Sequence, residues 1–172
     1  TLTLAGTATG SSMASIVGTG AGGLTKTGTG TWTLSGASTY TGATTVSAGT
    51  LQLGAAGGAT NTPLGTVGSG TTVASGATLD LNGYTLGTAE ALTLNGTGVG
   101  GTAGALANSS GTAVTYSGLL TLGSDATVNA TGSITLSNAG TITGSGSTLT
   151  LAGTATGSSM ASIVGTGAGG LT

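Results

Sequence analysis

The stretch from Thr31 to Leu53 reads TWTLSGASTYTGATTVSAGTLQL, and the spacing of its apolar residues decides the fold. Apolar and polar residues alternate in TWTL and TLQL, and Gly or Ser follows each segment. An alternation with a period of two places one side of a strand in a core and the other side in solvent. Gly and Ser are typical of turns. The stretch therefore predicts short β-strands separated by turns.

Eight segments of this kind recur along the chain, and the second apolar residue of each is a leucine: Leu4, Leu34, Leu53, Leu81, Leu94, Leu122, Leu136 and Leu151. A second short strand often precedes the segment, as TVSAG precedes TLQL. No stretch has apolar residues at helical spacing, and Gly and Thr are poor helix formers. We therefore predict an all-β chain with almost no helix.

The chain also contains a second, much longer repeat. Residues 148–172 are identical to residues 1–25 at all 25 positions, an offset of 147 residues. Core packing does not require identity at solvent positions such as Ser11 and Ser158, so the identity indicates a recently duplicated or homogenised tandem array. We expect residues 1–147 to be one full repeat and residues 148–172 to be the start of the next.

The strand spacing favours a right-handed parallel β-helix, also called a β-solenoid. A unit of strand and turn takes about seven residues, which gives about three short strands per coil and about seven coils per 147-residue repeat. A whole number of coils is expected, because each repeat then starts at the same corner. Two strands per coil, with ten coils of about 15 residues, fit the length equally well.

The inward positions of this pattern define an expected core. These positions are Leu2, Leu4, Trp32, Leu34, Val46, Leu51, Leu53, Val73, Leu79, Leu81, Leu92, Leu94, Leu120, Leu122, Val128, Ile134, Leu136, Ile142, Leu149 and Leu151.

Only four of the 172 residues are charged, and there is no Arg, His or Cys. One lysine cannot neutralise the several phosphates of a nucleic-acid site. His/Cys zinc sites and catalytic triads lack their residues, and no apolar run reaches the roughly 20 residues of a membrane helix. We expect no enzyme activity, no catalytic residue, no cofactor, no metal site, no nucleic-acid partner and no membrane insertion of this segment.

The four charged residues are expected at the surface. Lys26 is predicted to be a solvated cation. Asp80 alternates with leucines and is predicted to point outward, while Glu90 and Asp125 lie in turn-like stretches. Outward acids discourage aggregation of sheets.

Aromatic and threonine residues allow a second interpretation, in which a flank of the solenoid binds a ligand. Trp32 and Tyr40 could form a platform for carbohydrate, although Trp32 occupies an inward position; Tyr84 and Tyr116 lie near turns and stay undecided. Thr-x-Thr pairs such as Thr25/Thr27 and Thr141/Thr143 could bind ice if they lay in one file on one flat side. The irregular spacing of the segments argues against such a file.

Residues 22–54 read GGLTKTGTGTWTLSGASTYTGATTVSAGTLQLG. This string closely resembles the passenger-associated transport repeat of autotransporters, which is also called the autotransporter-associated β-strand repeat. The matching features include Gly22-Gly23-Leu24, Lys26, Thr39-Tyr40-Thr41-Gly42 and Gly49-Thr50-Leu51, whereas Trp32 replaces the commoner aliphatic residue.

The resemblance implies a parallel β-helix in the secreted passenger of a type V secretion system. It implies an extracellular location, at the cell surface of a Gram-negative bacterium, and it carries over no catalytic residue. The first functional hypothesis is a structural repeat of a very long surface protein that forms a fibre, stalk or sheath. Its partners would be identical repeats end to end, with lateral association into bundles. The alternative is an adhesin whose flank binds glycans, cells or ice.

Overall fold

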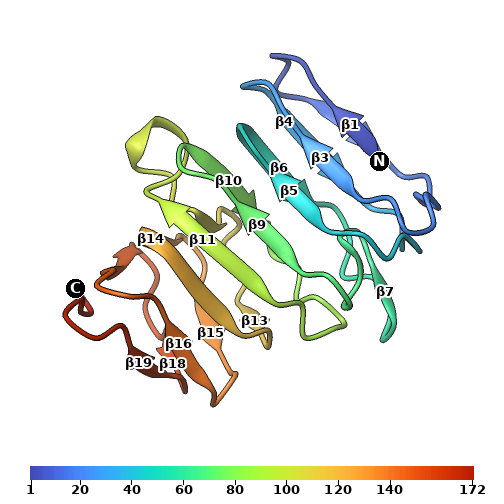
Figure 1. Ribbon diagram of the computed structural model, residues 1–172. Coiled ribbons are helices and arrows are strands. Elements are labelled where there is room, and N and C mark those ends of the chain that lie inside the picture. The colour runs from blue at the N-terminus through green and yellow to red at the C-terminus, as the bar shows by residue number, and fades with distance from the viewer.

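The computed structural model describes residues 1–172 and consists of short strands stacked in parallel along one axis (Figure 1). The two ends of the chain lie at opposite ends of the stack. The single helical element is the three-residue 3-10 turn η1, Val99–Gly101. The predicted all-β parallel β-solenoid is therefore confirmed.

None of the helices of the structure has the length and apolar character needed to cross a membrane.

The strands stack in three columns, which we number in the order in which the chain passes through them. Column 1 contains β1 (Leu2–Leu4), β3 (Leu24–Lys26), β5 (Thr44–Val46), β9 (Thr71–Val73), β11 (Leu92–Gly96), the first part of β14 (Leu120–Ala130), β16 (Thr141–Thr143) and β19 (Ile163–Gly165). Each step in this column is one turn of the solenoid. The seven steps from β1 to β19 therefore give about seven turns between Leu2 and Gly165.

Column 2 lies on the next side of the solenoid. It contains β2 (Ser11–Met13), β4 (Thr31–Leu34), β6 (Gly49–Leu53), β10 (Ala77–Asp80), β12 (Leu106–Asn108), the second part of β14 and β17 (Leu149–Gly153). β14 runs through both columns without a break, because its first part pairs with β11 and its second part with β12.

Column 3 is made of strands only in the later turns. It contains β13 (Val114–Tyr116), β15 (Ile134–Leu136) and β18 (Ser159–Met160). In the third turn, the short antiparallel pair β7 (Asn61–Thr62) and β8 (Gly65–Thr66) stands outside the columns. Three strands per coil are therefore present in the later turns and absent from the earlier ones.

One apolar core runs through the stack as a cluster of 29 buried residues. Seventeen of the residues expected in the core are buried: Leu4, Leu34, Val46, Leu51, Leu53, Val73, Leu79, Leu81, Leu92, Leu94, Leu120, Leu122, Val128, Ile134, Leu136, Ile142 and Leu149. The alternating pattern did not predict the buried residues outside its clearest segments, among them Leu24, Leu64, Leu86, Leu106 and Val114.

Three residues expected in the core lie outside the buried cluster. Leu2 and Trp32 are half-buried and pack against its edge. Leu151 is 43% exposed. Leu151 stacks on Val128, and on its other side Leu171 pairs with Leu149 while Thr172 accepts a hydrogen bond from the Leu151 N–H. No side chain of a following turn stacks on Leu151, and this leaves it partly open to solvent.

Candidate functional surfaces

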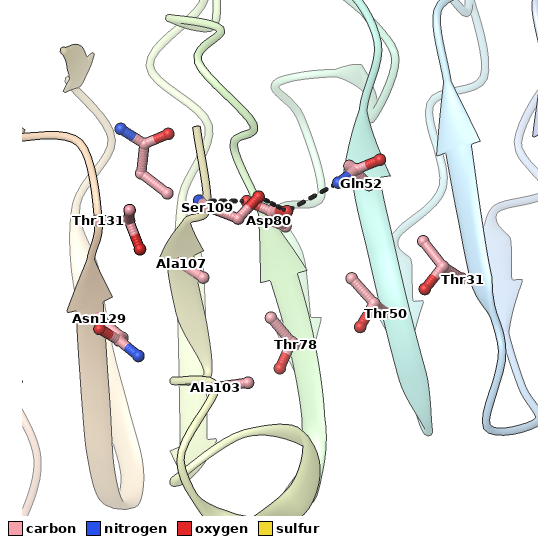
Figure 2. Close-up of a pocket in the computed structure, with 11 residues that line it drawn as sticks. Thr31, Thr50, Gln52, Thr78, Asp80, Ala103, Ala107, Ser109, Asn129 and Thr131 are labelled. Atoms are coloured by element: carbon pink, nitrogen blue, oxygen red, sulfur yellow. Dashed lines mark hydrogen bonds between the residues drawn. The ribbon is translucent and has the colours of Figure 1, made fainter. Parts of the chain in front are cut away.

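A hollow on the outside of column 2 is lined almost entirely by polar residues (Figure 2). We call it the polar groove; its volume is about 330 Å³ and its lining residues are Thr31, Thr50, Gln52, Thr78, Asp80, Ala103, Ala107, Asn108, Ser109, Asn129 and Thr131. Parallel strands place equivalent outward side chains side by side, about 4.8 Å apart. The groove therefore spans several turns along the stack.

Asp80 forms the buried centre of this groove. Its Oδ1 accepts hydrogen bonds from the backbone N–H groups of Asn82 (2.9 Å) and Ser109 (3.0 Å). Its Oδ2 accepts from Gln52 Nε2 (2.9 Å) and Ser109 Oγ (2.6 Å). Figure 2 shows the carboxylate between Gln52 and Ser109, which come from neighbouring turns.

The expectation that Asp80 is a surface charge is therefore wrong. Its side chain is on the outer side of β10, but the neighbouring turns cover it and leave it 4% exposed. A carboxylate that accepts four hydrogen bonds compensates its own desolvation. Asp80 is thus a cross-link between three turns of the solenoid.

Most other polar groups of the groove are also bound within the chain. Asn108 Nδ2 donates to the carbonyl groups of Thr112 (2.8 Å) and Gly132 (2.9 Å), and Thr78 Oγ1 donates to the carbonyl of Gly104 (2.9 Å). The hydroxyl groups of Thr31, Thr50 and Thr131 line the groove without such a bond. The groove therefore offers a few free hydroxyl groups around a rigid, internally bonded centre.

Column 1 carries a second regular surface, which we call the threonine file. Its members are outward residues of seven successive strands, each in register with the next: Thr3, Thr25, Thr45, Thr72, Thr93, Thr121 and Thr143. The structure therefore contains one file of single threonines, whereas the irregular spacing spoke against a file of Thr-x-Thr pairs, and the structure contains no such file of pairs. The irregular spacing in the sequence comes from corners and loops of different length, and the ladder pairing keeps the register.

Lys26 is fully buried, so its prediction as a solvated cation was also wrong. It occupies an inward position of column 1, in register between Leu4 and Val46. Its Nζ donates to the carbonyl groups of Thr27 (3.0 Å), Gly28 (2.8 Å) and Ala48 (3.0 Å). Burial lowers the pKa of the Lys26 ammonium group.

The space for the Lys26 ammonium group depends on Gly49. Gly49 has a φ of 65°, and a Cβ at this position would approach Lys26 Nζ to 2.8 Å. Any other residue would also be strained at this φ. Lys26 and Gly49 together close the corner between two turns.

Glu90 was predicted to be a surface acid in a turn, and this prediction is wrong because the residue is 1% exposed. Its Oε1 accepts a hydrogen bond from Thr71 Oγ1 (3.0 Å), whereas its Oε2 is buried without a partner. Tyr116 O–H donates to the Glu90 carbonyl (2.6 Å). Burial raises the pKa of the Glu90 carboxyl to about 7, although the bond from Thr71 opposes the shift.

The remaining predicted residues do not form a binding site. Tyr40 and Tyr116 are buried, and Tyr40 O–H lies 2.6 Å from Thr44 Oγ1, so no platform with Trp32 is exposed. Asp125 is exposed within β14, where its Oδ1 accepts from the Thr148 N–H (2.7 Å). Tyr84 is 37% exposed and is apart from both surfaces described above.

The fold is that of a β-solenoid built from stacked parallel turns. Within it, residues 24–53 match the family model of the passenger-associated-transport-repeat. The chain therefore contains this repeat, and the β-solenoid fits the repeat region of an autotransporter passenger. This family suggests a secreted or surface-exposed protein. No curated protein and no solved structure matches the chain.

Proposed function

We propose that the chain is part of a very long extracellular β-solenoid that serves as a fibre, stalk or sheath on a Gram-negative cell. The observation that carries this proposal is the unbroken parallel stack, in which buried apolar residues continue from Leu4 to Leu149. Residues 1–147 are one repeat, and residues 148–172 begin the next. Neighbouring repeats are partners end to end, and fibres associate laterally.

The stacking of the turns and the hydrogen bonds between them support a mechanical role. Each turn adds about 4.8 Å of length, and each turn covers the apolar face of the turn before it. All four charged residues form hydrogen bonds within or between turns. Reach and spacing are therefore the functions that this segment serves, and it contributes no catalysis.

Electron microscopy of the secreted protein tests this proposal. We expect thin rods whose contour length grows in proportion to the number of 147-residue repeats in natural length variants. Compact particles of constant length would contradict the proposal.

A second candidate is an adhesin whose flank binds a regular surface such as ice or a glycan. The threonine file favours it, because it presents hydroxyl and methyl groups about every 4.8 Å. An ice-shaping assay and a glycan array, each with the substitution Thr93→Tyr in the file, test this function. Thr115→Tyr on β13 is the matched control, because Thr115 is the central outward residue of a strand in column 3. Binding that Thr93→Tyr abolishes and Thr115→Tyr preserves would support the candidate.

A further inference from the structure

The two identical segments, residues 1–25 and 148–172, each form about one turn, but they start on different sides of the solenoid. In the first copy, β1 is in column 1 and β2 in column 2. In the second copy, β17 is in column 2, β18 in column 3 and β19 in column 1. The two strands with a counterpart in the first copy, β17 and β18, are thus one column further along the winding direction.

The internal register of the two copies is nevertheless the same. Leu2 pairs with Leu24 in the first copy, and Leu149 pairs with Leu171 in the second, so each copy closes one turn in 22 residues. The direction of the side chains is also preserved, because Ile16 and its equivalent Ile163 are 63% and 65% exposed. This isoleucine therefore points away from the core in both copies, although the copies are on different sides of the solenoid.

The offset of 147 residues is not a whole number of turns. Column 1 takes six steps from β1 to β16, and the chain then enters β17 in column 2. The repeat therefore spans six turns and one further side, which is nineteen sides. The expectation of a whole number of coils per repeat is therefore wrong, and the count per repeat is six and one third instead of about seven.

We infer that the surface formed by the second part of β14, β15 and β16 is the docking face for the next repeat, and that it receives this repeat rotated by one side. Its occupant in the structure is residues 149–165, held by the pairs Val128–Leu151, Leu136–Met160 and Ile142–Val164. Residues 2–18 have the same sequence as this occupant. They are therefore the segment that docks on the same face of a preceding repeat.

The inference rests on the proposed tandem array and adds a screw symmetry to it. Each repeat is turned by a third of a turn relative to the one before, and three repeats complete nineteen turns. At about 4.8 Å per turn, one repeat advances about 30 Å and three advance about 91 Å. The polar groove and the threonine file then move to the next side in each repeat, so a neighbouring fibre meets the same surface only at every third repeat.

Disulfide formation in the 172-residue chain tests the rotation, since the chain has no cysteine of its own. Neighbouring parallel strands are about 4.8 Å apart, which is within the Cα separation that disulfides require. Thr135 pairs with Ser159, and Asn129 pairs with Ala152. We expect rapid oxidation in Thr135→Cys/Ser159→Cys and in Asn129→Cys/Ala152→Cys.

The variant Asn129→Cys/Ser159→Cys is the discriminating one. In a repeat of six whole turns, Ser159 would lie in column 2 one turn after Asn129, because Asn129 is five turns after the equivalent Ser12 in the same register. We expect this pair to stay reduced under conditions that oxidise the other two. Oxidation of this pair, or failure of the other two in protein that keeps its β-sheet circular dichroism, would overturn the rotation. Either result would leave the test of contour length unaffected, so the tandem array and its symmetry can fail separately.

Discussion

At the scale of single residues, the few charges of this chain hold turns together. The side chains of Lys26 and Asp80 form hydrogen bonds with groups in neighbouring turns. Glu90 accepts a hydrogen bond from Thr71 in the interior. Alternation correctly placed Asp80 on the outer side of its strand. It could not show that Gln52 and Ser109, 28 and 29 residues away, cover the carboxylate. Burial by distant residues depends on register, which a local pattern does not contain.

Glu90 makes the stability of the solenoid pH-dependent. Its pKa is about 7 in the folded chain against 4.5 as the ordinary value, so the folded state keeps a proton that the unfolded state releases. Stability is therefore highest below pH 4.5 and falls as the pH rises to about 7, by on the order of 3 kcal/mol. The pKa values of the neighbouring Tyr40 and Tyr116 hydroxyl groups are raised, so these groups do not titrate in this pH window.

Urea unfolding at pH 5 and pH 8 measures this effect, with Glu90→Gln as the comparison. Glutamine has the same shape without the charge, so we expect the variant to lose most of the difference and to be the more stable protein at pH 8. An equal difference in both proteins would contradict the assignment to Glu90.

Removing the Asp80 carboxylate, which is itself buried, leaves the four donors of Gln52, Asn82 and Ser109 without this acceptor. We expect Asp80→Ala to lower the free energy of unfolding by about 3 kcal/mol. Asp125→Ala is the control, because Asp125 is exposed and accepts one bond, and it should cost less than about 1 kcal/mol. Equal losses in the two variants, measured by chemical denaturation, would show that the groove has no such centre.

Lys26→Met separates the apolar stem of Lys26 from its ammonium group. The variant keeps a long side chain between Leu4 and Val46 but removes three donated hydrogen bonds. We expect a loss of about 2 kcal/mol in the free energy of unfolding. An unchanged denaturation midpoint would mean that the ammonium group contributes nothing to the corner.

At the scale of strands, the alternating segments predicted the inward and outward sides well, but not the columns. TLTL at residues 1–4 and at residues 148–151 is the same sequence in two different columns. Column membership depends on the sum of all preceding corners and loops, such as the long loop with η1 between β11 and β12. A local pattern contains no information on that sum.

The strands also differ in their protection by neighbouring turns. β9 and β10 are paired on both sides, whereas β1 and β2 are each paired on one side only. Opening a strand in the middle of a stack requires breaking two ladders. Hydrogen exchange measured by mass spectrometry should therefore be slowest in residues 71–80 and faster in residues 2–13. Uniform protection along the chain would contradict this description.

At the scale of the whole molecule, one geometric property organises the structure, which is the stacking of parallel turns along a single axis. Low charge, glycine corners and outward threonines all follow from that arrangement, and so does the screw relation between repeats. X-ray diffraction from aligned fibres of the protein tests it most directly. We predict a strong reflection near 4.8 Å along the fibre axis, and its absence, or its appearance only across the axis, would contradict the account.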